Sequence, residues 1–329
     1  LYFEEGTGWA ISQIKDLAVG YKTRHWKRRK RMYNLLSLVI GAVVAIMIAI
    51  NGQLTSAYDL FVSAVIIHVI GTVFSLIVCL CRHQKILVKA EAPWMYLGGA
   101  IGVFTTFGNN LSYGRISMTS IVALVLFGQT VISLLIDSFG LMGMEKHPFK
   151  KTSVIGLVFA LAGMLVMLQP SGGGSNAGAA MAVAASFVTG IFLVLARTVN
   201  GRLAEQAGAL TGSFINHLVG LPITVFIMLF ARHGVDASFT VLPVHSWWIY
   251  CGGMLGVLTV FLYNVVVPKV ASFRLTILTF VAQVFTSLVL DVLFGNGYSK
   301  VTLIGGALVA AGMLVNMILD AMQAKQSEQ

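Results

Sequence analysis

Residues 122–140 read VALVLFGQTVISLLIDSFG, and residues 276–295 read TILTFVAQVFTSLVLDVLFG. Both runs are mostly apolar, and each carries a glutamine, a serine and an aspartate spaced four apart: Gln129, Ser133 and Asp137 in the first, and Gln283, Ser287 and Asp291 in the second. Residues four apart lie on one face of an α-helix. Each run therefore predicts a helix with one polar stripe, called here the Gln129 stripe and the Gln283 stripe.

The composition of the whole chain places these two runs in a membrane. Of 329 residues, 57% are hydrophobic and 10% are charged, and the mean hydropathy is +0.86. Soluble chains carry roughly 25% charged residues, and a membrane-spanning helix needs ~20 mostly apolar residues. We predict an all-α integral membrane protein with transmembrane helices near residues 33–53, 60–81, 93–112, 116–139, 152–168, 177–199, 209–231, 246–266, 270–294 and 301–320.

The two halves of the chain repeat one another. Besides the stripes, four stretches recur in the same order, at offsets between 149 and 154 residues: INGQL (50–54) as VNGRL (199–203), IIHVIG (66–71) as INHLVG (215–220), WMYLGGAIGV (94–103) as WIYCGGMLGV (248–257), and ALAGMLVM (160–167) as VAAGMLVN (309–316). Matches kept in register over so many helices indicate tandem duplication of a five-helix unit. Because five is odd, the second copy must enter the membrane from the opposite side.

This duplication divides the chain into four parts. Residues 1–32 are interpreted as a basic cytoplasmic extension, 33–168 as the first five-helix repeat, 169–176 as a Gly/Ser-rich linker, and 177–329 as the second repeat with a short cytoplasmic tail. Met32 directly precedes the first apolar segment, which leaves open whether the extension is native.

The charges are distributed as expected for such an inverted pair. With the N-terminus inside, 19 of the 22 lysines and arginines, Arg197 and Arg274 among them, fall on the cytoplasmic side, and three fall outside: Arg115, Arg232 and Lys300. The positive-inside rule then predicts a multi-pass protein of the cytoplasmic (inner or plasma) membrane with both termini in the cytoplasm. The net charge of +10 does not indicate nucleic-acid binding, because no basic soluble domain is present.

The motif series N-G-x-L, H-x-x-G, W-x-x-x-G-G-x-x-G and G/A-Q-x-x-x-S-x-x-x-D resembles the YdcZ-like branch of the drug/metabolite transporter (DMT) superfamily, in a tandem-fused form. The resemblance extends from residue 33 to about residue 320. It implies a ten-helix bundle of two inverted five-helix repeats and the export of a small molecule. It brings no substrate and no catalytic residue. The apolar segments contain no glutamate, so the resemblance does not imply the glutamate-based proton exchange of small multidrug exporters.

Several polar residues are candidates for contact with a substrate or a coupling proton. They are the six stripe residues together with His68, His217, Asn216, Asn110 and Asn264. The two histidines occupy matching repeat positions, and an imidazole titrates near physiological pH; the alternative for both is a packing role with one hydrogen-bond partner. Interhelical hydrogen bonds would explain the glutamines and serines equally well, and simple anchoring would explain the aspartates. The residues at the ends of the first and sixth apolar segments, Asn51 and Asn200, are interpreted as helix terminators.

Other residues are assigned to packing. Gly98, Gly102, Gly252 and Gly256 form small-x-x-x-small faces that let helix backbones approach. The chain has no predicted catalytic residue, cofactor or metal site. The expected partners are a small-molecule substrate and the lipid bilayer, with the protein as a monomer or homodimer. The alternative function is that of a membrane interaction or scaffold protein without transport activity.

Overall fold

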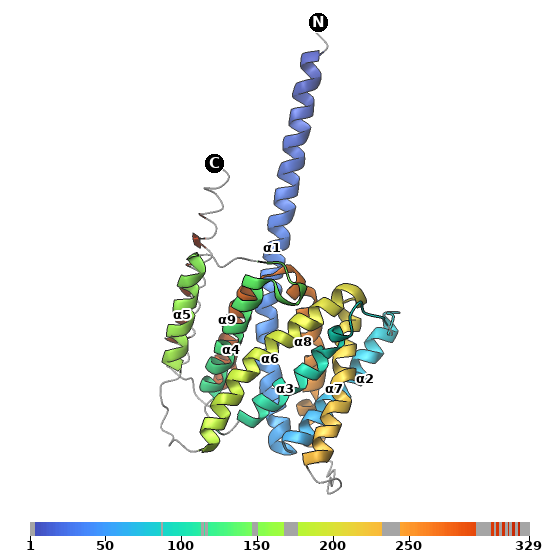
Figure 1. Cartoon of the computed structure of the whole chain (residues 1–329), viewed down its shortest axis with the longest axis vertical. Coiled ribbons are helices and arrows are strands. Elements are labelled where there is room, and N and C mark those ends of the chain that lie inside the picture. Colours follow the sequence, from blue (N-terminus) through green and yellow to red (C-terminus); the bar gives the residue numbers. More distant parts are fainter. Residues whose placement is uncertain are drawn as a thin grey trace.

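The computed structural model describes residues 4–86, 88–112, 115, 118–146, 151–167, 177–231 and 244–293, with scattered residues between 304 and 322. In this part of the chain the structure is helical, as predicted (Figure 1). The elements are α1 (Glu4–Ala57), α2 (Leu60–Cys81), η1 (Pro93–Leu97), α3 (Gly98–Ser112), α4 (Met118–Phe139), η2 (Leu141–Gly143), α5 (Lys151–Met167), α6 (Ala177–Ala207), α7 (Ala209–Ala231), η3 (Val244–Cys251), α8 (Gly252–Val266), η4 (Val267–Lys269) and α9 (Ser272–Leu293).

These helices form because the polar backbone groups of a chain inside the apolar bilayer must find their hydrogen-bond partners within the chain. Five described stretches are long and apolar enough to cross a membrane: Arg31–Ala57, Leu60–Cys81, Ala180–Ala207, Ala209–Ala231 and Ser246–Lys269. Leu124–Phe139 forms a shorter apolar helix. The described residues of the tenth predicted segment are also helical, and Gly312 lies directly against Phe159 of α5.

Local signals set the two tightest connections between helices. Asp59 caps α2, because its Oδ1 accepts hydrogen bonds from the backbone N–H groups of Phe61 and Val62 at 2.7 and 2.8 Å. This is the usual role of an aspartate at a helix N-cap. Gly208 alone separates α6 from α7 and has φ 88°. Glycine adopts that left-handed conformation without steric cost.

The first and sixth helices are longer than predicted. α1 is continuous from Glu4 through Met32 to Ala57, and α6 continues to Ala207. The assignment of Asn51 and Asn200 as terminators is therefore wrong. The polar run after Asn200 resembles a loop in sequence, but Asn200 and Leu203 are only 4% and 1% exposed. Contacts with other helices, rather than lipid, surround this part of α6.

The two repeats interlock. The first helix of each repeat packs on the third and fourth helices of the other: α1 on α8 and α9, and α6 on α3 and α4. A glycine brings each pair into backbone contact, Gly41 against the carbonyl of Thr279 and Gly190 against the carbonyl of Val125. These two contacts are repeat equivalents of each other, as the duplication requires. The second helices, α2 and α7, pack on one another.

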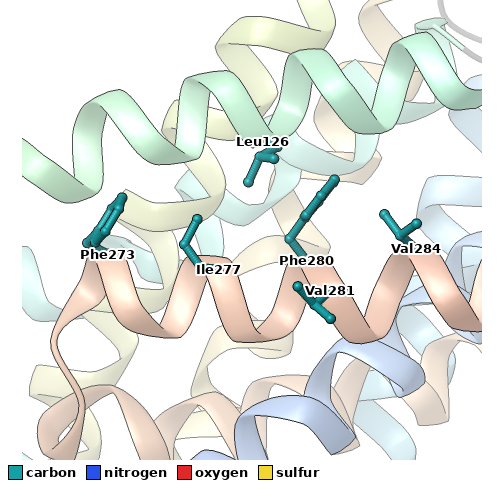
Figure 2. Packing of buried hydrophobic residues seen from close by; sticks show 6 residues of the cluster. All are labelled: Leu126, Phe273, Ile277, Phe280, Val281 and Val284. Atoms are coloured by element: carbon teal, nitrogen blue, oxygen red, sulfur yellow. The ribbon is translucent and has the colours of Figure 1, made fainter. Parts of the chain in front are cut away.

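A hydrophobic cluster joins the two stripe-bearing helices. Figure 2 shows Leu126 of α4 facing side chains that project from α9, among them Ile277 and Phe280. Leu126 and Phe280 are each 1% exposed. The cluster fixes α4 against α9, and thereby the polar residues that both helices carry.

Candidate functional site

The two candidate histidines meet at the crossing of α2 and α7. His68 and His217 are 6% and 4% exposed, and their ring centroids are 6.1 Å apart. The Nδ1 atom of each ring lies 2.9 Å from the carbonyl oxygen four residues earlier, that of Ala64 or of Ser213. Since a carbonyl only accepts, each Nδ1 carries the hydrogen and each Nε2 keeps its lone pair. Sequence analysis predicted equivalent positions for the two rings, and the fold places them side by side.

Glycine makes this crossing possible. A Cβ atom at Gly71 would overlap the His217 ring, and one at Gly220 would overlap the His68 ring. The motif H-x-x-G therefore acts between repeats, because the histidine of each repeat lies on the glycine of the other. Close helix contact through small residues is common in membranes.

An asparagine pair extends the polar region from α7 to α6. Asn200 donates from Nδ2 to Oδ1 of Asn216 at 2.7 Å, and both side chains are buried. Asn200 also lies directly against Gly98, as its repeat equivalent Asn51 lies against Gly252.

The Gln129 stripe surrounds a buried arginine that sequence analysis had placed among the cytoplasmic charges. Arg197 of α6 is only 3% exposed. Its Nη2 donates to Thr276 Oγ1 at 2.6 Å and to Ser133 Oγ at 3.3 Å. The same nitrogen contacts the carbonyl and the hydroxyl of Ser272 at 3.2 and 3.3 Å. The positioning of Arg197 therefore depends on residues from both repeats.

The remaining guanidinium nitrogens are less well satisfied. Nη1 of Arg197 lies 3.4 Å from Gln129 Oε1, and Nε is buried without a hydrogen-bond partner. The guanidinium carbon lies 5.6 Å from the centre of the Tyr263 ring, a cation–π distance.

Asp137, the third residue of the Gln129 stripe, caps α9 next to the polar groups that contact Arg197. Its two carboxylate oxygens accept the backbone N–H groups of Ser272 and Phe273 at 2.9 and 2.7 Å. The negative charge also acts electrostatically on Arg197. A carboxylate at a helix N-terminus is favourable because the first N–H groups lack partners within their own helix.

The Gln283 stripe has different surroundings. Gln283 is 9% exposed and Ser287 is partly buried, while the side chain of Asp291 lies outside the described residues. The repeat equivalent of Arg197 is Ile48, so this stripe has no corresponding cation. The equivalents of Ser272 and Thr276 are likewise apolar, Met118 and Val122.

The last two asparagine candidates, Asn264 and Asn110, lie near the ends of α8 and α3. Asn264 is 3% exposed and donates to the carbonyl of Ala209 at 3.0 Å. Asn110 is partly buried, and its Nδ2 has no hydrogen-bond partner.

The packing glycines differ from one another. Gly98 and Gly252 lie in direct contact with Asn200 and Asn51, but a Cβ at Gly102 would meet its nearest atom at 3.7 Å. A Cβ at Gly256 would lie 3.3 Å from His217 Nε2. The adjacent glycines make the close backbone contacts: Gly99 with the carbonyl of Asn216, and Gly253 with the carbonyl of Ile67. In the described part of the chain, histidines, cysteines and carboxylates form no group of three that could hold a metal ion.

Comparison with known proteins agrees with this architecture. A family profile described as "Putative inner membrane exporter, YdcZ" matches residues 32–166 and again residues 181–315. The chain belongs to this family and contains two copies of its unit, as the resemblance implied. The fold is thus a DMT-type bundle of two five-helix repeats in a multi-pass membrane protein, and the family is one of transporters rather than enzymes.

A solved crystal structure shares the fold. It superposes with a TM-score of 0.63 at 16% identity, over 88% of this chain and 96% of its own. No curated protein matches the chain.

Sequence analysis missed the residues that link the repeats. Arg197, Ser272, Thr276 and Asn200 were not among the candidates. One signal was available for Arg197: it follows the apolar run FLVLA, and a charge within an apolar segment is a functional candidate by default. The roles of Gly71 and Gly220 could not be predicted, because they depend on which helices cross.

Proposed function

We propose that the chain is a secondary transporter that exports a small organic molecule across the cytoplasmic membrane, with its substrate route between the two repeats. The observation that carries this proposal is the reciprocal packing of the repeats, which places the buried rings of His68 and His217 side by side, while Asn216, next to His217 in the chain, is bonded to Asn200. Inverted repeats with a polar site at their interface are a transporter device. A scaffold protein would have no need for paired buried imidazoles.

The orientation is part of the proposal. Both termini lie in the cytoplasm, because that arrangement places most lysines and arginines inside. Residues 169–178 are then external. The Gln129 stripe lies in the cytoplasmic half of the bundle, and the Gln283 stripe lies in the outer half.

Proton coupling through the histidine pair is the finer proposal. Each Nε2 has a free lone pair, and two imidazoles with centroids 6.1 Å apart would repel if both were charged. The pair therefore accepts one proton more easily than two, as interacting sites do. His217 is favoured as the carrier because Asn216 beside it joins the polar region around Asn200.

The test of export uses cells that lack or overproduce the protein. Growth under a panel of toxic small molecules and metabolites should improve with overproduction for at least one compound, and that compound should leave loaded proteoliposomes faster when the protein is present. If no compound in either assay responds to the protein, the scaffold alternative is favoured.

The test of coupling substitutes His217→Gln, which keeps hydrogen-bonding capacity but cannot titrate near neutral pH. The variant should fold and exchange substrate downhill, but it should lose accumulation driven by a pH gradient. His68→Gln should show a milder defect. Full gradient-driven transport by the double variant would show that the histidines only pack.

A further inference from the structure

We propose that Arg197 binds the carboxylate of an anionic substrate, which makes this protein an exporter of small organic acids. The inference rests on the proposed transport function and names the class of molecule transported. Inserting an arginine near the centre of a bilayer-spanning helix costs about 2.5–3.5 kcal/mol of free energy on insertion scales. Arg197 lies ten residues before the end of α6 at Ala207, about 15 Å along the helix axis.

The surroundings of Arg197 only partly offset this cost. Within the described part of the chain, it donates to uncharged groups, the oxygens of Gln129, Ser133, Ser272 and Thr276 and the side chain of Tyr263. Hydrogen bonds to an ionised acceptor are roughly twice as strong as neutral ones. A carboxylate would therefore be a better partner than the groups that now contact the guanidinium.

Donor capacity remains for such a partner. A guanidinium has five N–H donors. In Arg197, Nε is buried without a hydrogen-bond partner and the Nη1 contact with Gln129 is long, at 3.4 Å. The two nitrogens are held in place by the strong Nη2 contact with Thr276, so they need little reorganisation to accept a ligand.

The chain already places one carboxylate beside this cation. Asp137 takes the first N–H groups of α9, next to the Ser272 oxygens that Arg197 contacts. The N-terminus of α9 and Arg197 thus create a local field that favours negative charge. Both oxygens of Asp137 accept from the backbone of α9, and Nε of Arg197 has no hydrogen-bond partner among the described residues.

The number of cations indicates the charge of the substrate. The repeat equivalent of Arg197 is Ile48, so the duplicated bundle offers one such arginine and not two. Because Asp137 already contributes one negative charge beside this cation, a ligand with a single negative charge is repelled less than a phosphate monoester with its charge of about −1.5 to −2. Tyr263, 5.6 Å from the guanidinium, holds the cation from its other side.

The experiment measures thermal unfolding of the purified full chain in detergent. The probes are acids paired with their uncharged amides, lactate with lactamide and benzoate with benzamide, and succinate as a dianion. Ligands that bind the native state raise the unfolding midpoint. At least one monocarboxylate should raise the midpoint while its amide does not, and succinate should act more weakly.

Three variants identify the site. Arg197→Gln should raise the apparent Kd of the responding acid by at least about tenfold. Arg202→Gln makes the same change on the same helix, at a partly exposed arginine paired with Glu205, and should leave the response unchanged. If Arg197→Gln does not fold, Arg197→Lys decides: it keeps the charge, so it should still prefer the acid over the amide, with a smaller shift.

The results also separate this inference from the transport function. No acid response in the wild type, or a full response in Arg197→Gln, overturns the anionic substrate. Export of an uncharged or cationic compound that is unaffected by Arg197→Gln overturns it as well, while the proposed transport function stands. Acid binding at Arg197 without export from proteoliposomes overturns the transport function instead.

Discussion

At the crossing of α2 and α7, each repeat gives the other the same two residues, a histidine and a glycine. At the stripes, the repeats give each other different residues. The Gln129 stripe faces Arg197, Ser272 and Thr276, whereas the corresponding positions around the Gln283 stripe are Ile48, Met118 and Val122. The histidine–glycine contacts are thus the same in both directions, whereas the buried arginine beside the Gln129 stripe has an apolar repeat equivalent, Ile48.

This difference indicates that the histidine crossing and the stripes have different roles, although both recur in the two repeats. A symmetric centre can serve both ends of the route equally, as alternating access requires. An asymmetric stripe can distinguish the two ends, because the buried arginine beside the Gln129 stripe has an apolar equivalent, Ile48, in the other repeat. The comparison predicts that substitutions of the two glycines at the centre have matched effects on stability and that substitutions at the two stripes do not.

The largest expected effect comes from placing a cation in the other half. Ile48→Arg places a guanidinium at a partly buried position of the first repeat, whereas the residues equivalent to the hydroxyl partners of Arg197 are apolar in sequence, Met118 and Val122. It should destabilise the protein by about 3 kcal/mol, measured as a lower thermal unfolding midpoint in detergent. Ile48→Met keeps the position apolar and serves as the control. A stable Ile48→Arg protein would mean that the two halves are equally able to hold a cation.

The next effect concerns the cap on α9. Asp137→Ala removes the acceptor of two backbone N–H groups and should cost about 2 kcal/mol. Asp137→Asn keeps one oxygen and should cost less. Equal unfolding midpoints for wild type and Asp137→Ala would contradict the capping role.

The expected effects of Ile48→Arg and Asp137→Ala could not have been predicted from the stripe sequences alone. Local sequence patterns are enough to predict the helix count, the duplication and the equivalence of His68 with His217. They do not predict the network around Arg197, because it joins α4, α6 and α9: Arg197 is 64 positions from Ser133 and 79 from Thr276 in sequence. The positions of Asn51 and Asn200 were misjudged for the same reason: their polarity suggested a loop, and only the helix contacts reveal a buried site.

The symmetric centre gives the third prediction. Gly71→Ala and Gly220→Ala each place a methyl group against a histidine ring of the other repeat. Both should destabilise the protein by similar amounts, about 1–2 kcal/mol. Gly102→Ala is the matched control, because its nearest neighbour would be 3.7 Å away. A large difference between Gly71→Ala and Gly220→Ala would show that the centre is not symmetric.

The smallest effect on stability is expected for the stripe glutamines. Gln129→Leu removes only a 3.4 Å contact with Arg197 and should cost about 1 kcal/mol or less. Gln283→Leu should be close to neutral. Both should abolish transport if the stripes line the route, so transport and unfolding are measured on the same preparations. Early unfolding of both variants would favour a packing role.

The claim beneath all these comparisons is that the second repeat is inverted with respect to the first. A reporter enzyme that is active only outside the cytoplasm tests it directly, fused after Ser175 between the repeats or after Gln329 at the end of the chain. Inverted five-helix repeats with cytoplasmic termini predict an active fusion at Ser175 and an inactive fusion at Gln329. Activity at Gln329 with none at Ser175, or equal activity at both sites, would contradict the account.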